Sequence, residues 1–222
     1  MKITKKSQAL DLIEPSYLAS LASLLWIALY YLPVGGALFR LILPLPISLL
    51  QLRRGTKVAL DGIFVQILLL IILMGPIRGP LFLFPYGILS FWLGWCWLNN
   101  KSWWLSLFSG VLIGASGFLI RVFALSILVG ENLWILVTRA SYGLIQKFVS
   151  TMDISWSPST TSIQLVAIFL VVFQEFVYVF TIHIIAYAVF PRLKSSIPQP
   201  PNKISGFVAV SYTHLTLPTT PV

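Results

Sequence analysis

Arg121 and Glu175 are the charged residues of this sequence that stand out most against apolar surroundings. Burying a charge is costly, so a buried charge is usually paired with an opposite one. Arg121 continues a row of glycines, and Glu175 lies near the middle of a long apolar stretch. We therefore expect both side chains to face the interior of a helical bundle and to pair there. Such a pair either only holds the bundle together or forms the base of a polar ligand pocket.

Further arginines and tyrosines would complete such a pocket. Guanidinium groups bind carboxylate and phosphate oxygens in a fork, so arginines with few acidic neighbours suit an anionic or polar small ligand. The candidate ligand-binding residues are Arg40, Arg121, Arg139, Tyr142, Glu175 and Tyr178. The alternative is that each arginine extends its head group to a membrane interface. That alternative applies best to Arg40, which lies near a predicted helix end.

The motifs of common enzymes are missing from the sequence. It has no G-x-x-x-x-G-K-[ST] loop, no H-E-x-x-H and no G-x-S-x-G. Cys96 is the single cysteine, and His183 has no cysteine or second histidine near it in the sequence, so neither predicts a metal site. We expect no enzymatic activity, no metal and no cofactor.

The composition is that of a membrane protein. Hydrophobic residues make up 58% of the 222 residues and charged residues only 9%, whereas soluble domains average about 25% charged residues. Apolar runs such as Ile63 to Met74 do not alternate with polar residues, so barrel strands are not expected. We expect an all-α integral membrane bundle whose partner is the lipid bilayer. The net charge of +9 is read as a signal of orientation and not of nucleic-acid binding.

Six stretches have roughly the length and apolar character of a membrane span. They are Tyr17–Leu32, Ala37–Leu52, Val58–Met74, Leu81–Leu98, Trp103–Val129 and Ile163–Phe190. Pro44 and Pro46 interrupt the second. Most lysines and arginines then fall on one side, which predicts that both termini are cytoplasmic. Residues 1–16 form a cytoplasmic segment, residues 17–194 the transmembrane domain and residues 195–209 a disordered tail.

A less apolar stretch precedes the last span. Leu133 to Val149 places leucines on one side and Arg139, Tyr142 and Gln146 on another, the pattern of an amphipathic helix on the outer surface. A seventh span is the alternative, but it would move Arg192 and Lys194 to the outside.

Small residues recur at helical spacing in two of the predicted spans. Such rows let helix backbones approach closely in lipid, so we expect them to be packing seams. They are Gly110, Gly114 and Gly117 in one span, and Gly87, Ser90 and Gly94 in the other.

Two proline-containing segments resemble a known family. Leu43 to Gly55, LPLPISLLQLRRG, looks like its proline-rich second helix, and Gly79 to Gly87, GPLFLFPYG, extends the match. The family is the YybS-like group of uncharacterised multi-pass membrane proteins, particularly its cyanobacterial branch. That group is distantly similar to the substrate-binding S components of energy-coupling-factor vitamin transporters.

The resemblance implies a six-helix bundle with an outward-facing pocket. It also implies partners, namely a coupling membrane protein and ATPase subunits. In S components a small-xxx-small motif on the first helix docks the coupling protein. Ala19 and Ser23 are the nearest match here, although they depart from the usual alanine pair.

Two functions follow as hypotheses. The first is a binding or uptake component for a small vitamin-like or anionic solute, without an ATPase of its own, in the cytoplasmic (inner) membrane or a thylakoid membrane. The alternative is a non-transporting membrane scaffold or assembly factor. A transporter needs an open cavity lined by the polar residues, whereas a scaffold would pack them tightly.

The last residues, 210–222, are predicted to be an artefact. Val210 to Thr220 resembles a translated sequencing adapter over eleven consecutive residues, so we exclude the segment from fold reasoning.

We expect sequencing of the genomic locus to show different codons after about residue 209. Genomic DNA that encodes the same tail would contradict this.

Overall fold

The computed structural model describes residues 5–32, 35–153 and 158–201. Within these ranges every regular element is helical, which confirms the predicted all-α class. The predicted adapter segment and the end of the predicted tail lie outside the described residues.

Four of the helices are long and apolar enough to cross a membrane. They are α1 (Lys5–Tyr31, with its apolar part at Ile13–Tyr31), α4 (Thr56–Met74), α7 (Trp103–Val129) and α9 (Thr160–Val189). They coincide with the first, third, fifth and sixth predicted spans. A helix of 19 residues is about 28 Å long, close to the roughly 30 Å of a bilayer's hydrocarbon core.

The other two predicted spans are broken. The second consists of α2 (Gly36–Ile42) and α3 (Leu45–Arg54), divided at Pro44. The fourth, Leu81–Leu98, begins at the last residue of α5 (Arg78–Leu81) and continues through the π-helical turn η1 (Leu83–Gly87) into α6 (Ile88–Leu98). It has a non-helical backbone at Phe84 before a cis peptide bond to Pro85. Proline lacks the N–H that a continuing helix needs, which explains both breaks. Each broken span therefore packs as short pieces among the long helices.

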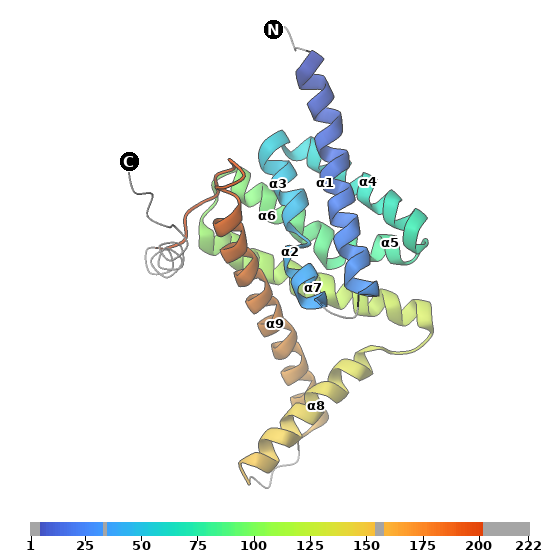
Figure 1. The fold of residues 1–222 in the computed structure, drawn as a ribbon. Helices are drawn as coiled ribbons and strands as arrows, with labels where there is room; N and C mark the ends of the chain where they lie inside the picture. The colour runs from blue at the N-terminus through green and yellow to red at the C-terminus, as the bar shows by residue number, and fades with distance from the viewer. Residues whose placement is uncertain (1–4, 33–34, 154–157, 202–222) are drawn as a thin grey trace, which may run out of the picture.

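The bundle core lies where α1, α3, α4, α6, α7 and α9 meet (Figure 1). Residues Leu45 to Gln51 of α3 are all buried. At one end, the Arg53 guanidinium donates hydrogen bonds to Glu14 of α1 at 2.8 Å and to the Leu193 carbonyl just after α9 at 2.7 Å. The start of α1 and the end of α9 therefore lie at the same end of the molecule, whereas the membrane side that they face stays a prediction.

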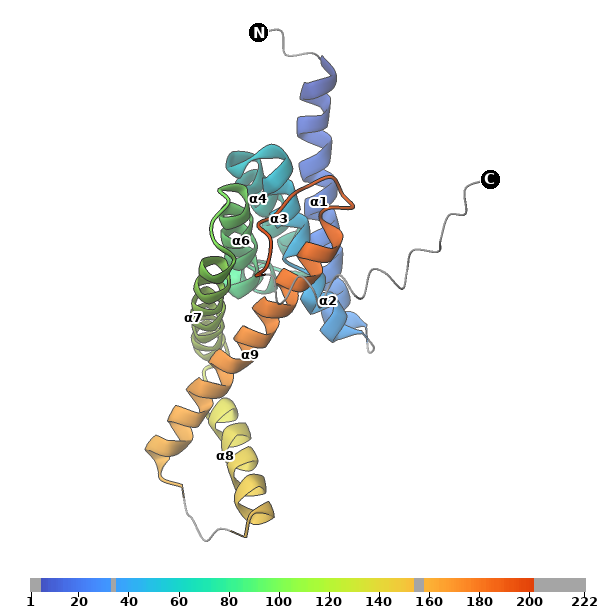
Figure 2. The same ribbon diagram turned by 90° about the vertical axis from the view of Figure 1, so that its left-hand side faces the viewer.

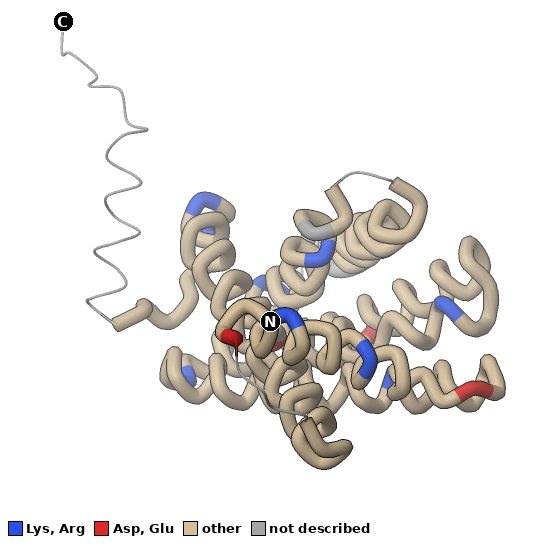
Figure 3. The backbone as a smooth tube through the Cα atoms, turned by 90° about the horizontal axis from the view of Figure 1, so that it is seen from below, with Lys and Arg blue, Asp and Glu red and all other residues tan. Residues whose placement is uncertain are grey.

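Helix α8 (Trp134–Thr151) is the predicted amphipathic helix, and it is set apart from the bundle. It packs along the first part of α9 and extends with it beyond the other helices (Figure 2). Only Ser141 and Ile145 of α8 are buried. Seen from below, Lys, Arg, Asp and Glu are sparse along the described part of the chain (Figure 3).

The glycines of α7 lie at close contacts with two neighbouring elements. A Cβ added to Gly110 would lie 3.0 Å from Val179 of α9, and one added to Gly114 would lie 2.7 Å from the Glu175 Oε2 atom. At Gly117 the added atom would lie 2.7 Å from the Cβ and 2.8 Å from the Cα of Pro85. Only glycine permits these approaches, so α7 sits directly against α9 and η1.

The second row of small residues, on η1 and α6, packs mainly toward α3. A Cβ on Gly94 would lie 2.5 Å from Gln51 Oε1, and the Ser90 carbonyl accepts a 2.8 Å hydrogen bond from Ser48. Gly87 instead lies against Phe82 and Leu83 of its own segment.

Gly117→Ala should destabilise the protein by about 1–3 kcal/mol, because the new methyl group meets the backbone of Pro85. The measurement is reversible unfolding in mixed micelles. Gly143→Ala is the control, since nothing lies within 4 Å of a Cβ there, and it should be neutral or stabilise by up to about 1 kcal/mol. Equal effects of the two substitutions would contradict the close packing.

Candidate functional site

Glu175, near the middle of α9, is buried and paired with Arg40 of α2. Its side chain is 1% exposed, and its Oε1 lies 3.2 Å from Arg40 Nη2. Arg40 is held from two further directions. The Tyr178 hydroxyl donates to the Arg40 carbonyl at 2.9 Å, and the Tyr178 ring lies 5.0 Å from the guanidinium carbon. One terminal atom of the Gln174 carboxamide lies 3.1 and 3.0 Å from Arg40 Nη1 and Nη2, and the amide accepts from both nitrogens when its oxygen is placed at that atom.

Arg121 of α7 lies among aromatic rings. It donates a 2.5 Å hydrogen bond to the Tyr30 hydroxyl, and its guanidinium carbon lies 5.3 Å from the Trp26 ring and 6.0 Å from the Tyr86 ring. Among the described residues, Arg121 has no carboxylate partner. Cation–π contacts of this kind contribute about 0.5–2 kcal/mol each and help to hold the partly exposed guanidinium in place.

The predicted pairing of Arg121 with Glu175 is therefore wrong, because Arg40 takes that place. The break at Pro44 ends α2 early and sets Arg40 against α9. Glu175 packs its other oxygen against Gly114. Arg121 lies seven residues further along α7 than Gly114, about 10 Å away along the helix axis.

Two tyrosines link the arginines into one group. The Tyr86 ring lies 5.9 Å from the guanidinium carbon of Arg40 as well as near Arg121, and the Tyr30 ring lies 5.5 Å from that of Arg78. We call the group the arginine–aromatic cluster. Its members are Arg40, Arg78, Arg121, Glu175, Trp26, Tyr30, Tyr86 and Tyr178.

Sequence reasoning missed Arg78 and three of the aromatic members of this cluster. Trp26 and Tyr30 stand four residues apart on α1, which places them on one helix face. Tyr86 lies in the proline-containing segment already singled out. The spacing of the first two was a usable signal, whereas no local pattern brings Tyr86 between two arginines.

The cluster carries more positive than negative charge, since three guanidinium groups face one carboxylate. Some of its polar atoms also have unused hydrogen-bonding capacity. Glu175 Oε2, Arg40 Nε and Trp26 Nε1 are buried and have no hydrogen-bond partner within the described part of the chain. An excess of cations with weakly solvated N–H groups attracts anions, and a guanidinium binds them through its fork of donors.

Arg139 and Tyr142 lie outside the cluster, because α8 packs beside the first part of α9. Both are exposed, and the Tyr142 hydroxyl accepts a hydrogen bond from Gln146 on the same helix. Of the six candidate ligand-binding residues, the structure thus brings Arg40, Glu175 and Tyr178 into contact. It joins Arg121 to them through Tyr86. Ligand binding by these residues stays a prediction.

The predicted docking pair on α1 faces inward. Ala19 and Ser23 are both 0% exposed, and the Ser23 hydroxyl donates to the Ala19 carbonyl at 2.9 Å. A partner cannot reach them in this fold, so the pair instead packs α1 against its own chain. This overturns their assignment as a docking site, because small residues at helical spacing serve internal and external contacts equally well.

His183 is held by two hydrogen bonds inside the bundle. Its Nδ1 lies 2.8 Å from the Val179 carbonyl and its Nε2 lies 2.8 Å from the Ser106 hydroxyl. An Nδ1–H tautomer donates to the carbonyl and accepts from the serine. The contacts assign His183 to the packing of α7 on α9.

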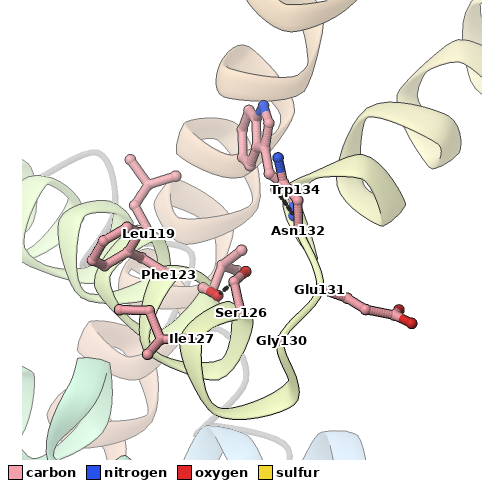
Figure 4. Close-up of a pocket in the computed structure, with 9 residues that line it drawn as sticks. Leu119, Phe123, Ser126, Ile127, Gly130, Glu131, Asn132 and Trp134 are labelled. Carbon is pink, nitrogen blue, oxygen red and sulfur yellow. Dashed lines mark hydrogen bonds between the residues drawn. The ribbon is translucent and has the colours of Figure 1, made fainter.

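Several cavities lie beside α8, and two of them also involve α7. One, of about 560 Å³, lies where α7 turns into α8. Figure 4 shows Leu119, Phe123 and Ile127 of α7 facing it, with Trp134 on the other side and the Glu131 carboxylate pointing away. The other, of about 570 Å³, lies between α7, α8 and α9 and includes Gln174 in its lining.

A double-mutant cycle of Arg40→Gln and Glu175→Gln should give a coupling energy of about 0.5–3 kcal/mol, because the two charges are in direct contact. Reversible unfolding in mixed micelles measures it. The matched cycle of Arg121→Gln with Glu175→Gln should be additive to within about 0.5 kcal/mol. Stronger coupling of Glu175 to Arg121 than to Arg40 would contradict the observed pairing.

Comparison with known proteins identifies a family. A protein-family model described as "Predicted membrane protein (DUF2232)" matches residues 20–203, which is most of the chain. No curated protein and no solved structure gave a match. The matched range includes the arginine–aromatic cluster and all four long helices from residue 20 onward. With its long apolar helices, the chain therefore belongs to the DUF2232 family of predicted membrane proteins.

Proposed function

We propose that this protein is the solute-binding component of a membrane uptake system and that its solute is a small anion. The observation that carries the proposal is the environment of Arg121, a partly exposed cation beside Trp26, Tyr30 and Tyr86 that has no carboxylate partner among the described residues. A charge inside a membrane bundle usually has a partner or a ligand. An anionic solute supplies the missing negative charge.

The two broken spans support the same site. Arg40 stands in α2 shortly before the break at Pro44, and Tyr86 directly follows Pro85 at the other break. In membrane transporters, binding sites are typically formed where helices are discontinuous, because the free backbone groups there can bind the solute. The arginine–aromatic cluster therefore contains one residue close to each break.

The uptake mechanism is proposed from the resemblance to S components. The chain would capture its solute from outside and depend on a coupling membrane protein and ATPase subunits for release. In that arrangement both termini are cytoplasmic, and the membrane is the cytoplasmic one or a thylakoid membrane. The relationship to the YybS-like family, and to its cyanobacterial branch in particular, is part of this proposal. With Ala19 and Ser23 buried, the coupling protein would bind another part of the surface.

A non-transporting scaffold is the second candidate, and the packing of Glu175 favours it. The carboxylate is 1% exposed and presses on Gly114, so this part of the cluster is filled by protein. In a scaffold, the Arg40–Glu175 pair and the aromatic contacts of Arg121 would serve stability alone.

A thermal-unfolding screen against small anions and vitamins separates the two. A ligand that binds only the folded protein stabilises it by about 2.7 kcal/mol at 100 times its Kd. We expect at least one anion to raise the melting temperature, and Arg121→Ala to abolish that rise.

Arg139→Ala is the matched control, since it removes the same charge from the exposed face of α8, and it should keep the rise. A panel without any shift, or a shift that survives Arg121→Ala, would favour the scaffold.

A further inference from the structure

The cavity between α7, α8 and α9 has the size and lining of a ligand site. Its volume of about 570 Å³ lies within the roughly 300–1,000 Å³ of small-molecule sites. Phe118 of α7, Val137 and Leu144 of α8, and Leu170 of α9 contribute to its apolar wall. Such a wall fits a hydrocarbon chain, because apolar side chains offer no hydrogen bonds to a polar ligand.

Two polar side chains, Ser141 and Gln174, belong to the lining of this cavity. The Ser141 hydroxyl donates to the Val137 carbonyl of its own helix at 2.9 Å, so it is already used. Gln174 is the other polar side chain of the lining, and its carboxamide contacts both terminal nitrogens of Arg40. The apolar cavity is thereby joined through Gln174 to a guanidinium of the arginine–aromatic cluster.

Arg40 has capacity for a further anion. Its Nη2 lies 3.2 Å from Glu175 Oε1, the Gln174 carboxamide lies close to both terminal nitrogens, and the Arg40 side chain is 30% exposed. A guanidinium has five N–H donors, so a donor that neither Glu175 nor Gln174 uses can bind a second anionic oxygen. Arg121 shares the Tyr86 ring with Arg40 and adds to the positive potential there.

We propose that the site takes a single-chain amphipathic anion. Its phosphate or carboxylate head would bind Arg40 beside Gln174, and its hydrocarbon chain would fill the cavity between α7, α8 and α9. This inference rests on the proposed function and names the class of its solute. The occupant is one free chain and not a bilayer phospholipid, because helices of this chain bound the cavity on three sides and its volume is that of a single small ligand.

The test is saturable binding of radiolabelled dodecyl phosphate to the protein in phosphatidylcholine nanodiscs, with binding to empty nanodiscs subtracted. Methyl phosphate has the head without the chain, and dodecanol has the chain without the charge. Each should compete at least about tenfold more weakly than unlabelled dodecyl phosphate, because every buried methylene group and the charge both add affinity.

Two variants of α8 probe the cavity without touching the ion pair. Ala140→Trp fills the cavity that Ala140 lines, and it should weaken binding by at least about tenfold, since the chain loses its space. Leu136→Trp adds the same ring at an exposed position of α8 outside that lining, and it should leave binding unchanged.

A third variant, Arg40→Lys, probes the head-group site. It keeps a charge beside Glu175 but loses the forked donors of the guanidinium, and it should also weaken binding.

Each contrary result has a distinct meaning. Equal competition by methyl phosphate, with no effect of Ala140→Trp, would overturn the amphipathic ligand but leave anion binding intact. Equal competition by dodecanol would reduce the site to an apolar cavity and overturn the role of Arg40. Loss of binding in phosphatidylglycerol nanodiscs would identify a bilayer lipid as the occupant and overturn the free chain. Absence of saturable binding by either phosphate would overturn both the inference and the proposed function.

Discussion

A buried carboxylate within an apolar bundle requires a counter-charge, and this requirement constrains much of the structure. Glu175 is almost fully enclosed, and an isolated charge in such surroundings is costly enough to exclude most arrangements. Arg40 supplies the counter-charge, which requires α2 to end where it does and to lie against α9. Gly114 makes room for the second carboxylate oxygen. A short helix, a proline break and a glycine are thus explained by one electrostatic requirement.

The same region contains the two breaks in the chain's helices. Where Pro44 and Pro85 interrupt their segments, side chains can approach from directions that continuous helices do not offer. Tyr86 is brought between Arg40 and Arg121 in this way. The resulting cluster combines an ion pair, Arg40–Glu175, with Arg121, which contacts aromatic side chains. The cluster thus connects the packing of the bundle to the proposed binding function.

The two ends of the bundle differ in their contacts. At the end where α1 begins, Arg53 ties α1, α3 and the residue after α9 together through short hydrogen bonds. At the opposite end α8 contacts mainly α9 and leaves cavities on both of its sides. Local opening takes place most readily where few buried contacts hold an element. The α8 end is therefore the part of the protein best suited to admit a ligand.

The sequence by itself determined the class of the protein and its long helices. The scarcity of charge demands a lipid-facing surface, and the long apolar stretches demand helices because backbone groups in lipid must bond within one segment. It also indicated Glu175, Arg121 and the glycine rows as residues of the interior, since helical spacing follows from local chemistry. The break at Pro44 was also predicted from the sequence, whereas Leu81–Leu98 was predicted as one span and its break at Pro85 appeared only in the structure.

Which side chains contact one another was decided by the tertiary structure alone. Which arginine reaches Glu175 depends on how α2 lies across α9, and no spacing within one helix encodes that. Ala19 and Ser23 face inward instead of toward a partner for the same reason. Side-chain identity sets what a residue can bind, but only the packing of helices distant in sequence sets what lies within reach.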